Sequence, residues 1–171
     1  MNNKIKYLVM DVDGTLTDGK IYMGNDGEMM KAFDIKDGYG IHDLLLPSKI
    51  VPVILTGRGS SILVNRCKEL GIKKVYQNVH NKLEELTRLV EGDGNNLSNV
   101  AYIGDDMNDA ECMKAIRENG GITGCPKDAV NGIRNIAQFK CKYNGGNGAV
   151  RDFIEYIVEF DNRKMQIRNQ Q

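Results

Sequence analysis

The sequence lacks the features that mark several specialised classes of protein. It contains no tryptophan, three prolines and two histidines among 171 residues. Its 23 basic residues equal its 23 acidic residues, so the formal net charge is zero, and neither half of the chain carries a long basic run. Because proteins that bind nucleic acid need a positively charged surface for the phosphate backbone, we expect no nucleic acid partner.

Long apolar runs are also missing. No segment reaches the roughly 18–20 apolar residues that a bilayer requires, and mean hydropathy is -0.41. Residues 1–10 end in a short apolar stretch that leads directly into Asp11 without a small-residue cleavage site, which is typical of a strand rather than a signal peptide. We therefore expect a soluble protein with no membrane partner.

The few cysteines favour a reducing compartment. The sequence has four, and none belongs to a Cys-x-x-Cys pair of the kind that binds zinc. Four distant cysteines also make a poor disulfide framework. We expect Cys67, Cys112, Cys125 and Cys141 to be buried thiols in a cytoplasmic protein.

The apolar pattern predicts an α/β fold. Short runs rich in Val, Ile and Tyr alternate with longer segments whose apolar residues recur every three or four positions, as a helix with one buried face requires. The expected strands are 7–10, 51–55, 74–76, 100–103 and 121–123, and the expected helices are 60–70, 81–90, 108–118 and 149–160. Because these strands are too apolar to be half exposed, we expect a three-layer, doubly wound, mostly parallel sheet of Rossmann-like type.

Two interruptions complete the expected layout. Residues 19–34 contain two short strand-like runs around Gly24-Asn-Asp-Gly27, which predicts a β-hairpin inserted after the first strand. The length favours a single domain over residues 1–160. Residues 161–171 are polar, and we expect them to form a frayed C-terminal tail.

Two acids close the first strand, as Asp11-Val-Asp13-Gly14-Thr15. Side chains two apart in a strand point the same way, so both carboxylates would face the edge where open parallel sheets bind ligands. The bland alternative is a simple turn, which Asp and Gly favour. A calcium-binding EF-hand fits poorly, because the loop lacks the later oxygen ligands and the flanking helices.

A second acidic group, Asp105-Asp106-Met-Asn-Asp109, follows the expected strand at 100–103. Several carboxylates at one sheet edge repel one another unless a divalent cation lies among them, and oxygen ligands without His or Cys favour Mg²⁺ over zinc. The alternative is a helix N-terminus, where Asp106 and Asp109 would serve only as caps. We favour metal binding for Asp105.

Two further strand ends carry groups suited to phosphate. Thr56-Gly57-Arg58 offers a hydroxyl, an accessible backbone amide and a cation before a helix. Lys82 opens the helix after the third of the expected sheet strands and would supply a point charge. An ordinary helix cap and a solvated lysine remain the alternatives.

These four segments, in this order, resemble the four motifs of the haloacid dehalogenase superfamily over about residues 5–125. A narrower likeness connects the chain with small capless sugar-acid phosphatases, whose type member hydrolyses 3-deoxy-D-manno-octulosonate 8-phosphate. That likeness rests on the hairpin and on three motifs, Asn81-Lys82-Leu83, Cys125-Pro126-x-Asp128-Ala129 and Gly145-Gly146-x-Gly148-Ala149-Val150-Arg151.

The resemblance implies a role for each motif residue. Asp11 would be the nucleophile and Asp13 the general acid and base. Mg²⁺ would be held by a side-chain oxygen of Asp11, the backbone carbonyl of Asp13 and the carboxylate of Asp105. Phosphate would be bound by Thr56, Gly57 and Lys82.

The resemblance also implies a substrate and an assembly. Arg58 and Arg66 match arginines of the octulosonate phosphatases and would bind the sugar acid, although Arg66 fits a helix surface equally well. Hairpins of neighbouring subunits would complete the pocket in a homotetramer. Two residues depart from the common pattern, Thr15 in place of valine and Asn147 in place of arginine, and we expect neither to touch the phosphoryl chemistry.

Rival functions keep the same fold. One is a phosphatase for a nonulosonate 9-phosphate of the sialic acid type. Another is a non-catalytic regulatory or receiver domain, against which the presence of both Asp11 and Asp13 argues, because a receiver needs no acid to protonate a leaving sugar.

Overall fold

The structure, a computed structural model, describes residues 4–168. Within that range the main sheet has six strands, all parallel. Their order across the sheet is β5 (Lys74–Tyr76), β4 (Val51–Leu55), β1 (Tyr7–Met10), β6 (Val100–Ile103), β7 (Ile122–Cys125) and β8 (Phe139–Lys140). The first strand of the chain is therefore central, with a β–α crossover to each side.

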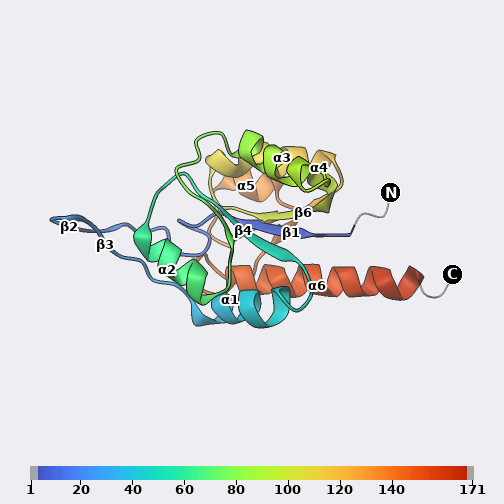
Figure 1. The fold of residues 1–171 in the computed structure, drawn as a ribbon, viewed down its shortest axis with the longest axis horizontal. Helices are drawn as coiled ribbons and strands as arrows, with labels where there is room; N and C mark the ends of the chain where they lie inside the picture. The colour runs from blue at the N-terminus through green and yellow to red at the C-terminus, as the bar shows by residue number, and fades with distance from the viewer. Residues whose placement is uncertain (1–3, 169–171) are drawn as a thin grey trace.

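Helices cover both faces of this sheet (Figure 1). One face carries α1 (Ile35–Tyr39), the π-helical segment η1 (Gly40–Leu45), α2 (Ser61–Glu69) and α6 (Ala149–Arg168). The other carries α3 (Lys82–Gly92), α4 (Ala110–Glu118) and α5 (Asn131–Ile136). The short 3-10 turns η2 (Leu97–Asn99) and η3 (Met107–Asp109) precede β6 and α4. The predicted three-layer α/β fold is confirmed.

The alternation of side chains along β1 explains the two cores. Leu8 and Met10 pack with α2 and α6, whereas Tyr7 and Val9 pack with α3 and α4. All four are at most 4% exposed. Burying an aliphatic side chain of this size contributes about 1.5–3 kcal/mol, so a strand that is apolar on both faces is stable only between two helical layers.

The predicted hairpin is also present. Strands β2 (Tyr22–Gly24) and β3 (Gly27–Met30) pair antiparallel and project beyond the edge of the main sheet (Figure 1). Gly27 has a φ of 110°, which an L side chain would adopt only with strain, so glycine suits this turn. Met23, Met29 and Met30 are exposed, at 62%, 65% and 45%.

One boundary prediction is wrong. We expected the last helix to end at residue 160 and a frayed tail to follow, but α6 continues to Arg168. The residues after 160 include Arg, Lys, Met and Gln, which are good helix formers, and no glycine or proline stops the helix before Arg168. Residues 169–171 of the expected tail lie outside the described range.

Several short elements were not predicted. The helical turns of α1 and η1 contain Gly38 and Gly40, whose low helix propensity hides the pattern. Strand β8 has two residues and pairs with β7 at the edge of the sheet.

None of the described helices is both long and apolar enough to cross a membrane. The four cysteines are free and buried, as expected.

Candidate active site

A cleft opens at the carboxyl edge of the sheet, where three neighbouring strands end. Met10 pairs in register with Ile54 of β4 and Ile103 of β6, so the residues after each strand emerge at the same level. The cleft is lined by Asp11, Asp13, Gly19, Thr56, Gly57, Arg58, Asp105, Asp106 and Asn108. Most of the predicted site residues are thus brought together.

Asp11 lies at the bottom of this cleft, 4% exposed. The Nζ of Lys82 lies 3.0 Å from its Oδ2, and the backbone N–H of Val12 donates to its Oδ1 at 2.7 Å. Burial raises the pKa of Asp11 to about 6, and the nearby charge of Asp109 adds to this, while Lys82 opposes it. Lys82 thus partly offsets the cost of burying the Asp11 carboxylate.

Asp109 organises this end of the site. Its Oδ1 accepts hydrogen bonds from Lys82 Nζ at 2.8 Å and from the Tyr102 hydroxyl at 2.7 Å. Its Oδ2 accepts from the backbone N–H of Asp105 at 3.1 Å. The side chain is fully buried. Burial opposes a charge on Lys82, but Asp109 and Asp11 outweigh it and raise the lysine pKa.

Sequence reasoning underrated Asp109. Its position in the Asp-Asp-x-x-Asp motif fits a helix cap, and Asp106 does cap η3 by accepting from the N–H of Met107. Asp109 closes the same capping box by accepting from the N–H of Asp106 at 3.5 Å, but its buried side chain also accepts from Lys82 and from the Tyr102 hydroxyl. The signal that would have distinguished them is the apolar Ala110, Cys112 and Met113 stretch that follows, which buries the face of α4 on which Asp109 stands.

Asp105 faces Asp11 from the tip of β6. Thr15 Oγ1 donates to its Oδ1 at 2.9 Å. Burial raises the pKa of Asp105 to about 7 in spite of that hydrogen bond. Thr15 thus orients an acid of the cleft, and the expectation that it does not touch the phosphoryl chemistry stays a prediction.

Gly14 allows this close approach. A Cβ at Gly14 would lie 2.0 Å from an oxygen of Asp105, and its φ of 89° is unfavourable for other residues. The first motif and the fourth thus meet at a position where only glycine fits.

The acids form a group that suits a hard cation. One carboxylate oxygen each from Asp11, Asp105 and Asp109 lies within 4.8 Å of the others. Asp11 and Asp105 line the cleft whereas Asp109 is fully buried beneath it, so Asp11 and Asp105 are the better candidates for direct ligands. Buried carboxylates with raised pKa values fit a divalent ion, because its charge offsets their repulsion.

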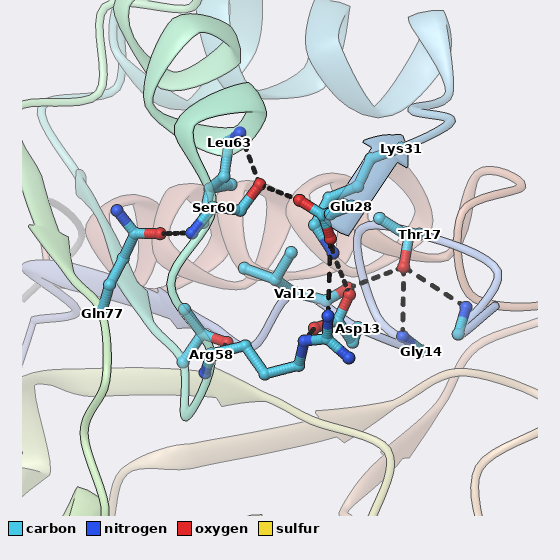
Figure 2. Close-up of polar contacts among 12 residues, drawn as sticks. Val12, Asp13, Gly14, Thr17, Glu28, Lys31, Arg58, Ser60, Leu63 and Gln77 are labelled. Atoms are coloured by element: carbon cyan, nitrogen blue, oxygen red, sulfur yellow. Dashed lines mark hydrogen bonds and ion pairs between the residues drawn. The ribbon is translucent and has the colours of Figure 1, made fainter. Parts of the chain in front are cut away.

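Asp13 lines the same cleft but has different partners. Its carboxylate pairs with Lys31, next to the hairpin, and its Oδ2 lies 3.6 Å from Arg58 Nε (Figure 2). Both carboxylates therefore face the cleft, as expected. Of these two aspartates, Asp11 is the one that contacts Lys82.

The segment after β4 supplies a polar rim. Thr56 is 3% exposed and Gly57 adjoins it in the cleft lining. Ser60 caps α2 by accepting from the N–H of Leu63 at 3.3 Å, so the helix begins shortly after Arg58, which lines the cleft. This is the hydroxyl, amide and helix N-terminus arrangement that suits phosphate.

Comparison with known proteins identifies the family. The 3-deoxy-D-manno-octulosonate 8-phosphate phosphatase of Escherichia coli K12 is 40% identical over 154 residues, which cover 90% of this chain and 79% of the relative. The chain belongs to the 3-deoxy-D-manno-octulosonate 8-phosphate phosphatase family. A scan against protein-family models found no match.

Solved structures of this family have the same fold. The Yersinia pestis enzyme superposes with a TM-score of 0.85 at 38% identity, covering 92% of this chain and 83% of its own. The Moraxella catarrhalis enzyme, solved with a magnesium ion, a phosphate ion and the sugar acid, gives a TM-score of 0.86 at 36% identity, with coverages of 98% and 94%. A Legionella pneumophila protein assigned to the haloacid dehalogenase superfamily also superposes, with a TM-score of 0.86 at 32% identity and coverages of 94% and 86%, which confirms the resemblance to that superfamily.

Arg66 lies away from the cleft that the family motifs build. Its guanidinium carbon is 5.9 Å from the centre of the Phe33 ring, and its Nη1 lies 2.8 Å from Glu69. It lines two neighbouring crevices with Gly38 and Leu70. Within one subunit the structure does not bring Arg66 to the acids, so its role in substrate binding stays a prediction.

The family's glycine-rich loop supports the site from behind. Gly145 packs so tightly on the backbone of Gly14 that a Cβ there would lie 1.8 Å from the Gly14 oxygen. The loop is held by Asp37, which accepts backbone hydrogen bonds from Gly148 at 3.3 Å and Arg151 at 2.7 Å. Sequence reasoning missed Asp37, because its partners lie more than 100 positions away.

Proposed function

We propose that this chain is a magnesium-dependent phosphatase that hydrolyses 3-deoxy-D-manno-octulosonate 8-phosphate through a phosphorylated Asp11. The observation that carries the proposal is the buried Asp11 carboxylate beside Lys82, in one cleft with Asp105, Asp13 and Thr56, in a member of this family. A nucleophile, a cation, a metal-binding acid and a proton donor are the parts that phosphoryl transfer through an aspartate requires.

In the first step an Asp11 oxygen attacks phosphorus. The bond between phosphorus and the sugar oxygen breaks, and that oxygen takes the bonding electrons. Asp13 donates a proton to it, so the sugar acid leaves as a neutral alcohol and not as an alkoxide. The products of this step are the aspartyl-phosphate at Asp11 and an ionised Asp13.

In the second step Asp13 acts as a base. It takes a proton from a water molecule, and the resulting oxygen attacks the phosphorus of the aspartyl-phosphate. The bond to Asp11 breaks, inorganic phosphate leaves, and both aspartates return to their starting states. One residue serves as acid and then as base because the water enters where the sugar oxygen left.

Asp11, Asp105 and the backbone carbonyl of Asp13 would hold Mg²⁺ in this site. The bound ion supplies charge neutralisation, which lets an anionic carboxylate approach an anionic phosphate. The donor set fits, since it consists of oxygens only and the two carboxylates are close together and buried. Thr15 and Asp109 would position Asp105 through its carboxylate and its backbone N–H.

The phosphoryl oxygens would be bound by Thr56, Gly57 and Lys82. Thr56 and Gly57 line the same cleft as the acids, and the Nζ of Lys82 lies 3.0 Å from Asp11 Oδ2. Lys82 is held in place by Asp109, so its charge is already oriented before the substrate arrives. Preorganised donors of this kind stabilise the transition state most.

Arg58 would bind the acidic sugar. It lines the cleft and its side chain is 45% exposed, so its guanidinium is accessible to a carboxylate. Arg66 would contribute only if the assembly brings it to a neighbouring subunit's pocket. Both assignments rest on the family resemblance together with these positions.

A homotetramer would explain the exposed hairpin. Met23, Met29 and Met30 present apolar surface on β2 and β3, and such a surface is stabilised when a second subunit covers it. A cytoplasmic location fits the four free, buried cysteines. Size-exclusion chromatography with light scattering tests the tetramer.

The decisive experiment is a substrate panel with phosphate release as the readout. We expect the highest kcat/KM for 3-deoxy-D-manno-octulosonate 8-phosphate, lower values for nonulosonate 9-phosphates, and at least about 100-fold lower values for neutral sugar phosphates that lack the carboxylate. Chelation with EDTA should abolish turnover, and added Mg²⁺ should restore it. A flat profile across the panel, or full activity in EDTA, would contradict the proposal.

A further inference from the structure

Lys31 is a buried cation between two carboxylates. It follows β3 directly, and its side chain is 2% exposed. Its Nζ pairs with the carboxylate of Asp13 and lies 3.1 Å from Oε1 of Glu28 (Figure 2). A lysine is almost never fully buried unless its charge is paired, so these two contacts account for its place in the fold.

Glu28 anchors Lys31 to the body of the molecule. Its Oε2 accepts a hydrogen bond from the Ser60 hydroxyl, the N-cap of α2. Ser60 is itself held by the side chain of Gln77, whose oxygen accepts from the Ser60 N–H at 2.6 Å. Burial opposes a charge on Glu28, but Ser60 and Lys31 lower its pKa, so it stays ionised. Through Glu28 the base of the hairpin is fixed to the start of α2.

Arg58 contacts the same two carboxylates in a looser way. It lies 3.6 Å from Asp13 and 3.6 Å from Glu28, and its side chain is 45% exposed. Arg58 is therefore free to turn toward a ligand, whereas Lys31 would have to leave its two carboxylate partners to reach solvent. When Asp13 is ionised, as it would be between the two steps, the two cations balance the two anions, and Arg58 is the more accessible of the two cations.

We propose that Lys31 is the positioning residue for Asp13, with Glu28 as its anchor. The inference rests on the proposed function of Asp13 as acid and base. Lys31 would hold the Asp13 carboxylate on the side of the cleft where the sugar oxygen leaves, apart from the oxygens of Asp11 and Asp105 that would bind the metal. The hairpin thus serves the chemistry of its own subunit.

The physical reason is competition for Asp13. A free carboxylate beside a divalent cation is drawn to it, and a metal-bound Asp13 would be poorly placed to deliver a proton to the leaving oxygen. The ammonium of Lys31, fixed on the side of Asp13 away from Asp11 and Asp105, would keep the Asp13 carboxylate from binding the cation. Displacement of a catalytic group by about 1 Å lowers turnover by roughly 100-fold.

The test compares Lys31→Met with the wild type on two substrates. One is the sugar-acid phosphate, whose alkoxide needs a proton in order to leave, and the other is p-nitrophenyl phosphate, whose phenolate does not. For the sugar-acid phosphate we expect kcat to fall about 30- to 100-fold with KM changed less than about threefold. For p-nitrophenyl phosphate we expect single-turnover phosphorylation of Asp11 to fall less than about fivefold.

Three further variants separate positioning from a structural effect. Lys31→Arg keeps the charge and should recover kcat to within about fivefold of the wild type, while Glu28→Gln should weaken the same step less than Lys31→Met. The matched control is Lys20→Met. Lys20 is an exposed lysine of the hairpin that pairs with Asp18 at 3.2 Å, so this variant should have the kcat of the wild type on both substrates. Circular dichroism verifies that each variant is folded, and Glu28→Gln carries the test if Lys31→Met is not.

The outcomes are distinct. Three results with Lys31→Met would each overturn the role of Lys31. They are equal losses of rate on both substrates, a raised KM with unchanged kcat, and a kcat equal to that of the wild type. If the wild type fails on the octulosonate phosphate, the proposed function fails, and the same comparison is made with the best alkyl phosphate of the panel.

Discussion

Asp11 and Asp13 stand two positions apart at the end of one strand, yet they belong to different parts of the molecule. Asp11 lies beside Lys82 and Asp105, which follow strands β5 and β6 of the main sheet. Asp13 is joined to Lys31 and Arg58, at the base of the hairpin and after β4. The sheet therefore builds the side of the cleft that would transfer phosphate, and the inserted hairpin builds the side that would handle the leaving group.

The largest expected effect tests this division directly. Asp11→Asn removes the nucleophile at nearly constant volume, so kcat should fall at least about 10⁴-fold, with no phosphorylated protein for either an alkyl or an aryl phosphate. Asp13→Asn should lower kcat for the alkyl phosphate by about 10²- to 10⁴-fold but still allow phosphorylation by the aryl phosphate. Intact-mass spectrometry after quenching measures this difference.

If both variants lose phosphorylation equally on both substrates, the two carboxylates do not divide the work, and the comparison fails. Circular dichroism and gel filtration show whether each variant keeps the fold of the wild type.

A smaller effect is expected when the support of the sheet side is removed. Asp109→Asn leaves Lys82 and the Tyr102 hydroxyl without their shared charged acceptor in a fully buried place. We expect a loss of about 3 kcal/mol in the free energy of unfolding and about 100-fold in kcat. Urea unfolding and steady-state kinetics measure the two.

Asp106→Asn is the matched control for stability, because asparagine caps a helical turn about as well as aspartate. Its free energy of unfolding should stay within about 0.5 kcal/mol of the wild type. Equal losses in both variants would show that Asp109 acts as a cap only.

The last effect, expected in stability alone and spread over a range of pH, concerns Asp37, which holds the glycine-rich loop beside Gly14. Burial raises its pKa from 3.8 to about 6. Between these values the folded protein holds a proton that the unfolded chain has released, so stability falls as pH rises. The stability is complete below about pH 4 and is lost as pH passes about 6, which for this shift corresponds to about 3 kcal/mol.

Asp37→Asn carries no such proton. Its free energy of unfolding, measured by urea in EDTA between pH 4 and pH 7, should decline less steeply than that of the wild type. At pH 4 both side chains are neutral, so any difference there reports the changed hydrogen bonds to Gly148 and Arg151. Parallel profiles over the whole range would contradict the raised pKa.

Much of the cleft was predictable from the chain alone. The short, continuously apolar runs place Asp11 and Asp105 after strands, and parallel strands deliver their carboxyl ends to one edge. Thr56, Gly57 and Lys82 follow from the same argument. The exceptions are instructive, because Asp109 and Asp106 have the same local signature and only burial separates them.

The sequence by itself determined which residues stand at the strand ends, because apolar periodicity is a local property that a chain carries with it. Only the tertiary structure decided their partners. Thr15 meets Asp105 across 90 positions, Lys31 meets Asp13 across 18, and Asp37 meets Gly148 across 111. Such pairings depend on how distant segments pack on the sheet, and no spacing within any one segment encodes them.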